Sequence, residues 1–330
     1  RTRMISATKQ PKLALNNGTQ MPQFGLGTWQ ATNADEFNTA LRAALDCGYR
    51  LIDTAHIYQN EHVIGEVLEE YIKAGKLKRS DVFITTKLPF YSMTPEEADA
   101  MIPKQLESLR TDYVDLYLVH TPMSLKLKPG KPMKLDPDCL TIHDDFEHID
   151  IWRVLEKWHK KGALKALGLS NFSGRQIEAL YKLAEIKPTN LQVECYLYWP
   201  QHELFELTKK LNMTLTAYGP LGSPGRKAFR PEMTGPDAFP MEDLLVIEVA
   251  KKYNKTPAQV LLRQMLQRGI ATIPKSTNEK RLKENATIFD FELTAEEMDK
   301  FEKIDKRVRL FDFPFGKESR HYPFDDVKVR

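Results

Sequence analysis

The sequence predicts one α/β domain, residues 1–330, folded as a (β/α)8 TIM barrel, and three observations support this. Apolar runs typical of buried parallel strands alternate with amphipathic helical patterns about eight times along the 330 residues. Parallel strands joined by helices require right-handed crossovers, and eight such units at this length favour a closed barrel over an open sheet. An Asn-Gly pair between two strand-like runs adds an N-terminal β-hairpin.

The first half of the chain is predicted to form the hairpin and four βα units. The hairpin strands are residues 12–15 and 20–21, on either side of Asn16-Asn17-Gly18-Thr19. The next strands are expected at residues 24–27, 51–53, 82–87 and 113–120, and their helices at residues 35–47, 62–73, 95–109 and 151–161. A long Pro-, Lys- and Met-rich stretch, residues 121–148, precedes the fourth helix and is expected to be a functional loop.

The second half repeats the alternation. Strands are expected at residues 166–169, 191–194, 214–218 and 270–273, and helices at residues 174–183, 201–211, 244–253, 257–267, 279–285 and 294–304. Residues 219–241 form a second long loop, and residues 307–330 an aromatic tail. Both loops and the tail are expected to border the substrate at the C-terminal face of the barrel. Residues 1–11 are an N-terminal extension, in which Arg1–Arg3, ahead of Met4, are consistent with a vector-derived remnant.

The composition excludes several classes of function. The chain is 42% hydrophobic and 28% charged, and its net charge of +3, spread over interleaved acids and bases, predicts no nucleic-acid partner. No apolar run approaches the roughly 18 residues of a membrane span, and the N-terminus lacks an apolar signal core. Cys47, Cys139 and Cys195 are too few for a disulfide framework, which predicts reduced thiols and a cytoplasmic location.

Four ionisable residues lie at or just after the ends of predicted strands: Asp53, Tyr58, Lys87 and His120. Each alone has an ordinary structural interpretation, as a cap, a loop tyrosine, a surface charge or a strand-end histidine. In a barrel, however, these strand ends converge on one mouth, where such a group of titratable side chains indicates a functional site.

At these residues the chain closely resembles the aldo-keto reductases, especially their aldose/aldehyde reductase-like branch. The resemblance covers about residues 13–324, and its motifs occur in the expected order. They are Gly25-Leu26-Gly27-Thr28-Trp29, Gly48-Tyr49-Arg50-Leu51-Ile52-Asp53-Thr54-Ala55, Tyr58-Gln59-Asn60-Glu61, Thr86-Lys87-Leu88, Asp115-Leu116-Tyr117-Leu118-Val119-His120, Gly168-Leu169-Ser170-Asn171-Phe172, Tyr218-Gly219-Pro220-Leu221-Gly222-Ser223 and Ile273-Pro274-Lys275-Ser276.

The resemblance implies a catalytic tetrad of Tyr58, Asp53, Lys87 and His120. Tyr58 would be the general acid that protonates a carbonyl oxygen as hydride from NADPH reaches the carbon. An adjacent ammonium, Lys87, is expected to lower the tyrosine pKa from its usual value near 10. Asp53 would hold Lys87 in place, and His120 would orient the carbonyl; a histidine at this position favours carbonyl reduction over reduction of steroid double bonds.

The resemblance also implies an NADPH/NADP+ site. Ser170, Asn171 and Gln192 would bind the carboxamide, Tyr218 would stack on the nicotinamide, and the loop after it would follow the pyrophosphate. Lys275 and Arg281 would hold the 2′-phosphate, at a place where barrels commonly bind phosphate; without the resemblance, Lys280-Arg281-Leu282-Lys283 is simply a solvated helix face. The full set of expected cofactor-binding residues is Gly27, Thr28, Trp29, Asp53, Ser170, Asn171, Gln192, Tyr218, Gly219, Leu221, Ser223, Lys275, Ser276, Thr277, Arg281, Glu284 and Asn285.

Substrate contacts are expected from Trp29, Ile57, Tyr58, His120 and Thr121, with Met123, Phe311, Phe313 and Tyr322 as further wall residues. Pro89 and Thr121 stand where aldose reductases commonly have tryptophan, so a wider mouth that prefers apolar or aromatic carbonyls to sugars is expected. No metal site is expected, because His143 and His148 lie in an acidic stretch interpreted as a solvated loop.

The predicted function is therefore reduction of a small-molecule aldehyde or ketone to an alcohol by an NADP(H)-dependent enzyme. The chain is expected to act as a cytoplasmic monomer without a membrane partner. The alternative is a cofactor-binding structural or regulatory protein on the same fold, related to a crystallin or a channel β-subunit. A metal-dependent barrel hydrolase would need a ligand cluster that the sequence does not contain.

Overall fold

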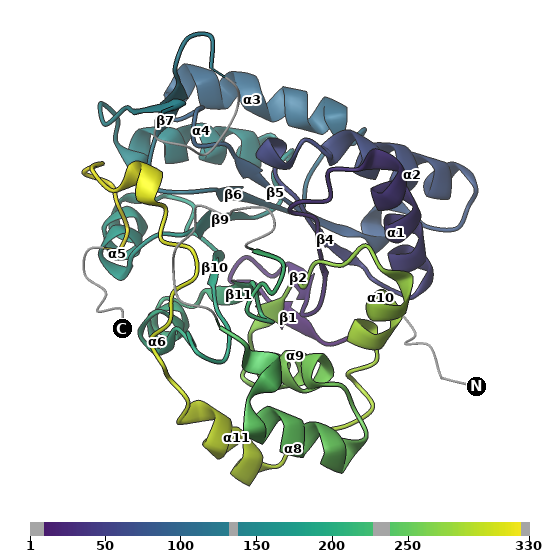
Figure 1. The fold of residues 1–330 in the computed structure, drawn as a ribbon. Coiled ribbons are helices and arrows are strands. Elements are labelled where there is room, and N and C mark those ends of the chain that lie inside the picture. Colours follow the sequence, from purple (N-terminus) through teal and green to yellow (C-terminus); the bar gives the residue numbers. More distant parts are fainter. Residues whose placement is uncertain (1–9, 132–137, 227–237, 325–330) are drawn as a thin grey trace.

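Eight parallel strands form the central sheet of the computed structural model, which describes residues 10–131, 138–226 and 238–324 (Figure 1). They are β3 (Leu26–Gly27), β4 (Leu51–Asp53), β5 (Phe83–Leu88), β6 (Leu116–Val119), β9 (Leu167–Ser170), β10 (Asn190–Glu194), β11 (Thr214–Tyr218) and β12 (Ala271–Thr272). Neighbours in the sheet follow the order of the chain. All eight predicted barrel strands are therefore present.

The first and last strands meet and close the sheet into a barrel. Isolated parallel bridges join Phe24 to Thr272 and Gly27 to Lys275. At this seam the backbones approach so closely that a Cβ atom on Gly27 would lie 2.4 Å from the Ile273 carbonyl oxygen. Only glycine fits there without moving the opposite strand.

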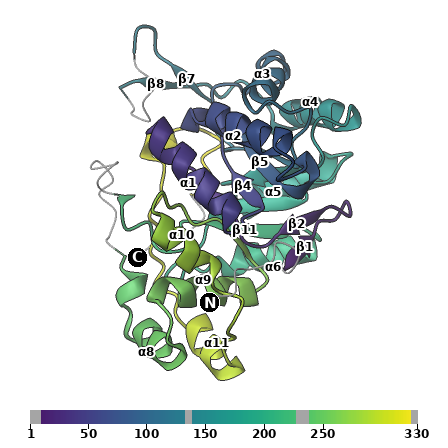
Figure 2. The ribbon, with the colours of Figure 1, turned by 90° about the vertical axis from the view of Figure 1, so that its right-hand side faces the viewer.

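Helices surround the barrel, as parallel strands with buried faces require (Figures 1 and 2). They are α1 (Ala34–Asp46), α2 (Glu61–Lys73), α3 (Pro95–Ser108), α4 (His148–Lys160), α5 (Gly174–Leu183), α6 (His202–Lys210), α8 (Leu244–Tyr253), α9 (Pro257–Gln267), α10 (Glu279–Ala286) and α11 (Ala295–Glu302). Their apolar faces pack on the strands: Leu41, Ile64, Ile102 and Trp152 are fully buried in the largest core cluster. Within the described residues, no helix has both the length and the apolarity needed to cross a membrane.

The predicted N-terminal hairpin seals one end of the barrel. Strands β1 (Lys12–Ala14) and β2 (Gln20–Pro22) pair antiparallel, and Leu15 and Met21 pack into the same cluster as the inner barrel residues. Figure 2 shows the hairpin at one end of the molecule and the β7–β8 loop and the C-terminal tail at the other. The open end is therefore the one with the carboxyl termini of the strands.

The loop predicted at residues 121–148 differs from the expectation. It contains a second hairpin, β7 (Leu125–Leu127) paired antiparallel with β8 (Leu140–Ile142). Short 3-10 turns lie at His56–Tyr58, Arg79–Asp81, Pro240–Glu242 and Pro314–Gly316. Four segments lie outside the described residues: most of the predicted N-terminal extension, residues 132–137 and 227–237 of the two long loops, and residues 325–330 of the tail.

Candidate active site

A cavity of about 660 Å³ opens at the carboxyl ends of the strands. Every residue expected to bind cofactor contributes to its lining, and so do Ile57, Tyr58, His120 and Thr121 from the expected substrate site. These residues come from the ends of seven strands and from helix α10, so only the closed barrel brings them together.

Lys87 lies just beneath the cavity and is completely buried near the carboxyl end of β5. Its Nζ donates to Asp53 Oδ1 at 2.6 Å and to the Thr54 carbonyl oxygen at 2.8 Å, and lies 3.5 Å from the Tyr58 hydroxyl. Burial raises the pKa of Asp53 and lowers that of Lys87, and the pairing of the two charges opposes both shifts. Gln192 Nε2 donates to the other Asp53 oxygen at 2.6 Å, which leaves this carboxylate fully hydrogen-bonded.

The pKa of Tyr58 differs from the expectation. Burial raises it well above 10, and the charge of Asp53 adds to that rise. The expected net lowering is wrong for this arrangement, because desolvation of the phenolate outweighs the attraction of the Lys87 ammonium, which lies 2.6 Å from Asp53 Oδ1 and 3.5 Å from the Tyr58 hydroxyl. The consequence is a phenol that stays protonated at neutral pH and can serve as a proton donor.

His120 stands at the end of β6 with its ring 5.8 Å from that of Tyr58, edge to face. Burial, followed by repulsion from Lys87, lowers its pKa well below 6.5, so the imidazole is neutral. Its Nδ1 is buried and has no hydrogen-bond partner among the described residues. A neutral ring next to a proton donor can direct an N–H towards a carbonyl oxygen.

Asn171 and Tyr218 form one wall of the cavity through a chain of hydrogen bonds. Asn171 has a left-handed backbone, with φ of 63°, which asparagine tolerates better than most residues. Its Nδ2 donates to the His120 carbonyl oxygen at 2.9 Å, and its Oδ1 accepts from the Tyr218 hydroxyl at 2.8 Å. These bonds fix the Tyr218 ring beside Asn171 at the cavity.

A buried polar network behind the tetrad was not predicted from the sequence. Glu61 Oε1 accepts from Thr86 Oγ1 at 2.6 Å and from Gln105 Nε2 at 3.0 Å, and Gln105 Oε1 accepts from the Tyr117 hydroxyl at 2.6 Å. Gln105 Nε2 also donates to the Lys87 carbonyl oxygen at 3.2 Å. The network fixes the backbone of β5 from helices α2 and α3. Glu61 and Gln105 look like ordinary polar residues on helix faces, so the sequence did not indicate that they meet.

The far end of the cavity carries two cations. Lys275 follows β12, and Arg281 lies in the first turn of α10, which Asn278 caps through the Arg281 N–H at 3.0 Å. Burial lowers the pKa of Lys275, the charge of Glu36 opposes this shift, and the charge of Arg281 adds to it. Neither side chain forms a salt bridge with any described residue, whereas their neighbours Lys280 and Lys283 pair with Glu284 and Glu279. Two unpaired cations beside a helix N-terminus fit the 2′-phosphate of NADPH.

The mouth of the cavity is aromatic and apolar. Trp29, Phe311 and Phe313 line it as expected, and Phe90, Leu125 and Phe315, which the sequence did not indicate, join them. Phe90 is next to Pro89, so this part of the wall keeps an aromatic ring despite the missing tryptophan.

The sequence-based prediction was wrong for two of the wall residues. Met123 is fully buried, with its sulfur packed where a Cβ on Gly316 would lie, and the Tyr322 hydroxyl turns away to the Asp312 carbonyl oxygen. Neither lines the cavity.

The described residues, which include His143 and His148, contain no cluster of three or more possible metal ligands. His148 Nε2 donates to the Pro122 carbonyl oxygen at 2.7 Å, and burial lowers the pKa of His148 to about 4. Asp144 is also not merely solvated, because it accepts from Ser319 Oγ at 2.6 Å and from the Arg320 N–H at 2.9 Å.

Comparison with known proteins agrees with this geometry. The Aldo/keto reductase family model matches residues 23–306. The chain is 41% identical over 299 residues to aldo-keto reductase family 1 member A1-A of Danio rerio, covering 90% of each chain. It is 36% identical over 323 residues to prostaglandin F synthase 1 of Bos taurus, covering 96% of this chain and 98% of the relative.

Two solved structures have the same fold. The aldose reductase of Schistosoma japonicum superimposes with a TM-score of 0.85 at 38% identity, covering 96% of this chain and 99% of that one. The aldo-keto reductase of Bombyx mori, solved in complex with NADP, superimposes with a TM-score of 0.84 at 31% identity, covering 95% and 99%. With a family model over most of its length and relatives of this similarity, the chain belongs to the aldo/keto reductase family.

Proposed function

We propose that this chain reduces a small aldehyde or ketone to an alcohol with Tyr58 as the proton donor. Membership in the aldo/keto reductase family makes it an NADPH-dependent oxidoreductase. The observation that carries the assignment of roles is the buried contact of Lys87 with both Asp53 and Tyr58 at the floor of the cavity. Such a set of groups does proton chemistry, and a purely structural or regulatory barrel would have no need of it.

The fit of the cofactor rests on features of this chain. The unpaired charges of Lys275 and Arg281 suit the 2′-phosphate, Gly219, Leu221 and Ser223 line the path between the two ends, and the Tyr218 ring is fixed beside Asn171. When NADPH is bound, its nicotinamide supplies the hydride for the carbonyl carbon.

The protein residues handle the proton. Tyr58, kept protonated by burial, donates its hydroxyl proton to the carbonyl oxygen as negative charge develops there. The Lys87 ammonium, 3.5 Å from that hydroxyl, stabilises the phenolate that remains, and Asp53 keeps the ammonium in position. The neutral His120 directs one N–H to the same oxygen and so orients the substrate.

The walls indicate the class of carbonyl compound. Trp29, Phe90, Phe311, Phe313 and Phe315 surround the mouth, and burying apolar surface against them contributes about 25 cal/mol per Å². Apolar or aromatic aldehydes and ketones are therefore the proposed substrates, in preference to sugars. We infer further that residues 1–330 act as one domain, since residues from Gly27 to Phe315 line the same cavity. We also propose that the protein works as a cytoplasmic monomer with its three buried cysteines reduced.

The test is a panel of carbonyl compounds assayed by NADPH oxidation, with wild type and Tyr58→Phe. The phenylalanine keeps the ring and removes the proton, so kcat is expected to fall by about 10²–10⁴-fold while NADPH affinity changes little. Tyr91→Phe is the matched control, since Tyr91 lies near the site but outside the cavity lining. Near-normal turnover by Tyr58→Phe would refute the proposed proton donor.

A further inference from the structure

Glu194 connects the barrel to the C-terminal tail. It is the last residue of β10, two residues after Gln192, and it is 1% exposed. Its Oε1 accepts the Leu310 N–H at 2.7 Å and its Oε2 accepts the Phe311 N–H at 2.9 Å. Both oxygens are therefore committed to consecutive backbone amides of one tail segment, which fixes that segment against a rigid strand.

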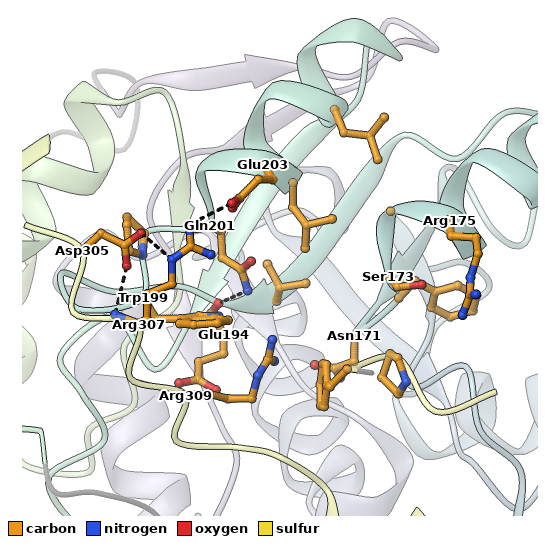
Figure 3. A pocket seen from close by; sticks show the side chains of 18 of the residues that line it. Asn171, Ser173, Arg175, Glu194, Trp199, Gln201, Glu203, Asp305, Arg307 and Arg309 are labelled. Atoms are coloured by element: carbon orange, nitrogen blue, oxygen red, sulfur yellow. Dashed lines mark hydrogen bonds and ion pairs between the residues drawn. The ribbon is translucent and has the colours of Figure 1, made fainter. Parts of the chain in front are cut away.

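A positive charge near Glu194 comes from Arg309, which belongs to the same tail segment. Figure 3 shows Glu194 and Arg309 side by side at the edge of a second cavity, of about 770 Å³, between helices α5 and α6 and the tail. The Arg309 guanidinium lies between two aromatic faces, 4.5 Å from the Trp199 ring and 3.7 Å from the Phe324 ring. The anchor thus consists of one barrel carboxylate and three consecutive tail residues.

The third of these residues, Phe311, reaches the active site. Its ring lies 5.6 Å from the Trp29 ring and 5.6 Å from the Tyr218 ring, in edge-to-face contact with both, and it lines the barrel-mouth cavity. Because Glu194 holds the amide of Phe311 itself, a shift of that amide moves the ring. No other side chain of the described residues accepts a hydrogen bond from this amide.

We propose that Glu194 is a positioning residue: it fixes the Phe311 ring as a wall of the substrate cavity and thereby sets the preference between large aromatic and small aliphatic carbonyls. The inference rests on the proposed carbonyl reduction but concerns selectivity, not the chemical step. Glu194 does not itself line the barrel-mouth cavity.

The decisive variant is Glu194→Gln, which has the same shape but offers one acceptor oxygen where two amides need one each. The second amide then faces an NH2 group and is left unpaired. With NADPH in excess, we expect KM for 4-nitrobenzaldehyde to rise about tenfold. For propanal, which is too small to touch the wall, kcat/KM should change less than twofold, and kcat should be nearly unchanged for both.

Glu156→Gln is the matched control. Glu156 is also a buried carboxylate, 2% exposed, and its Oε1 accepts two backbone amides, Glu185 at 2.8 Å and Ile186 at 2.9 Å. It lies on α4, at the outside of the barrel, so its loss should reduce stability without changing the ratio of the two aldehydes. A general effect of losing a buried carboxylate is thereby separated from positioning.

The double variant Glu194→Gln, Phe311→Ala tests whether Glu194 acts on selectivity through the Phe311 ring. Once the ring is gone, Glu194→Gln should add no further change to the ratio of kcat/KM values beyond that of Phe311→Ala alone. If the ratio still changes, or if Glu194→Gln affects both aldehydes equally, the proposal is overturned. Should Glu194→Gln not fold, Glu194→Asp, which keeps both acceptors but shortens the arm, must produce the same substrate-dependent loss. Absence of turnover by the wild type would instead count against the proposed function.

Discussion

Lys87 and Arg281 illustrate two ways in which single cations are used in this barrel. Lys87 is fully buried and its charge is matched within the fold by Asp53, so it can act on Tyr58 without attracting an external anion. Arg281 lines the cavity and is unmatched by any described carboxylate, so its charge remains available for a ligand. In the proposed function, the buried cation therefore serves catalysis and the cavity-lining cation serves cofactor binding.

The first prediction at the residue scale concerns cofactor choice. Two unit charges about 4 Å apart at an effective dielectric of about 20 interact by roughly 4 kcal/mol, of which desolvation and screening should leave about 2–3 kcal/mol. We expect Arg281→Ala to weaken NADPH binding about a hundredfold and NADH binding much less, and the wild-type preference to shrink as salt rises.

Fluorescence titration of both cofactors measures this, with Lys280→Ala as control. Lys280 precedes Arg281 on α10, but its side chain is 85% exposed and pairs with Glu284. Equal loss of NADPH and NADH affinity in Arg281→Ala would show that Arg281 does not hold the phosphate.

The second residue-scale prediction concerns pH. Burial raises the pKa of Glu194 from 4.5 to about 7, partly opposed by Arg309, Arg226 and the two tail amides. Because the folded pKa lies above the unfolded one, the stability that this group contributes is complete below about pH 4.5 and is lost as pH rises through 7. Between pH 5.5 and 8 the wild type should therefore lose about 2 kcal/mol of unfolding free energy relative to Glu194→Gln. Urea denaturation of both proteins at the two pH values gives the difference, and parallel pH profiles would contradict it.

At the scale of elements, the C-terminal tail is held at two points and spans the mouth between them. Glu194 binds residues 310–311, and Asp144, in the loop before α4, binds residues 319–320. Phe313 and Phe315, in the segment between, line the cavity. The tail is therefore a strap whose aromatic side chains are positioned by carboxylates from two different parts of the chain.

The two attachment points predict what happens to the tail when the one at Asp144 is weakened. Asp144→Asn keeps the size of the side chain but weakens its charged hydrogen bonds, each of which is worth about 1.5–3 kcal/mol when well formed. We expect amide hydrogen exchange of residues 313–322 to become about tenfold faster, with the barrel strands unchanged. Asp145→Asn, at the exposed neighbouring residue, is the control. Faster exchange over the whole chain would indicate global destabilisation instead.

The sequence predicted the elements that depend on local pattern and missed the features that depend on distant partners. Strands β4 to β6 and their helices follow from apolar periodicity, and Asp53, Lys87 and His120 could be placed because strand ends converge in a barrel. The β7–β8 hairpin was missed because its strands are three residues each and far apart in the sequence. Glu194 pairs with amides more than a hundred residues away. The pKa of Tyr58 could not be predicted because burial, which dominates it, is set by the whole fold.

At the scale of the whole molecule, stability depends on the seam between β3 and β12. A methyl group on Gly27 would collide with the Ile273 carbonyl oxygen at 2.4 Å, where two backbones are in contact and neither is a flexible side chain. Gly27→Ala should therefore cost about 1–3 kcal/mol, as overpacking does. It should also weaken NADPH binding, since Lys275 lies directly beyond the seam.

Thermal unfolding with and without NADPH measures both effects. Gly174→Ala is the control, because a Cβ there would lie 3.3 Å from the end of the Leu207 side chain, which can move. If both variants melted at the same temperature, the close approach at the seam would not limit stability.

The seam joins two segments that are far apart in the sequence, so the barrel can close only after both have been synthesised. One half of the closure, around Phe24, leaves the ribosome before its partner Thr272, and the strands between them emerge in the interval. Until then the nascent sheet has two open edges, and edges of this kind are prone to pair with other chains. Lys275 and Arg281, the proposed phosphate ligands, come after the closing strand, so this end of the cavity forms only as the barrel closes. Cofactor present in the cell could then favour the closed form of a newly made chain over one that is still open.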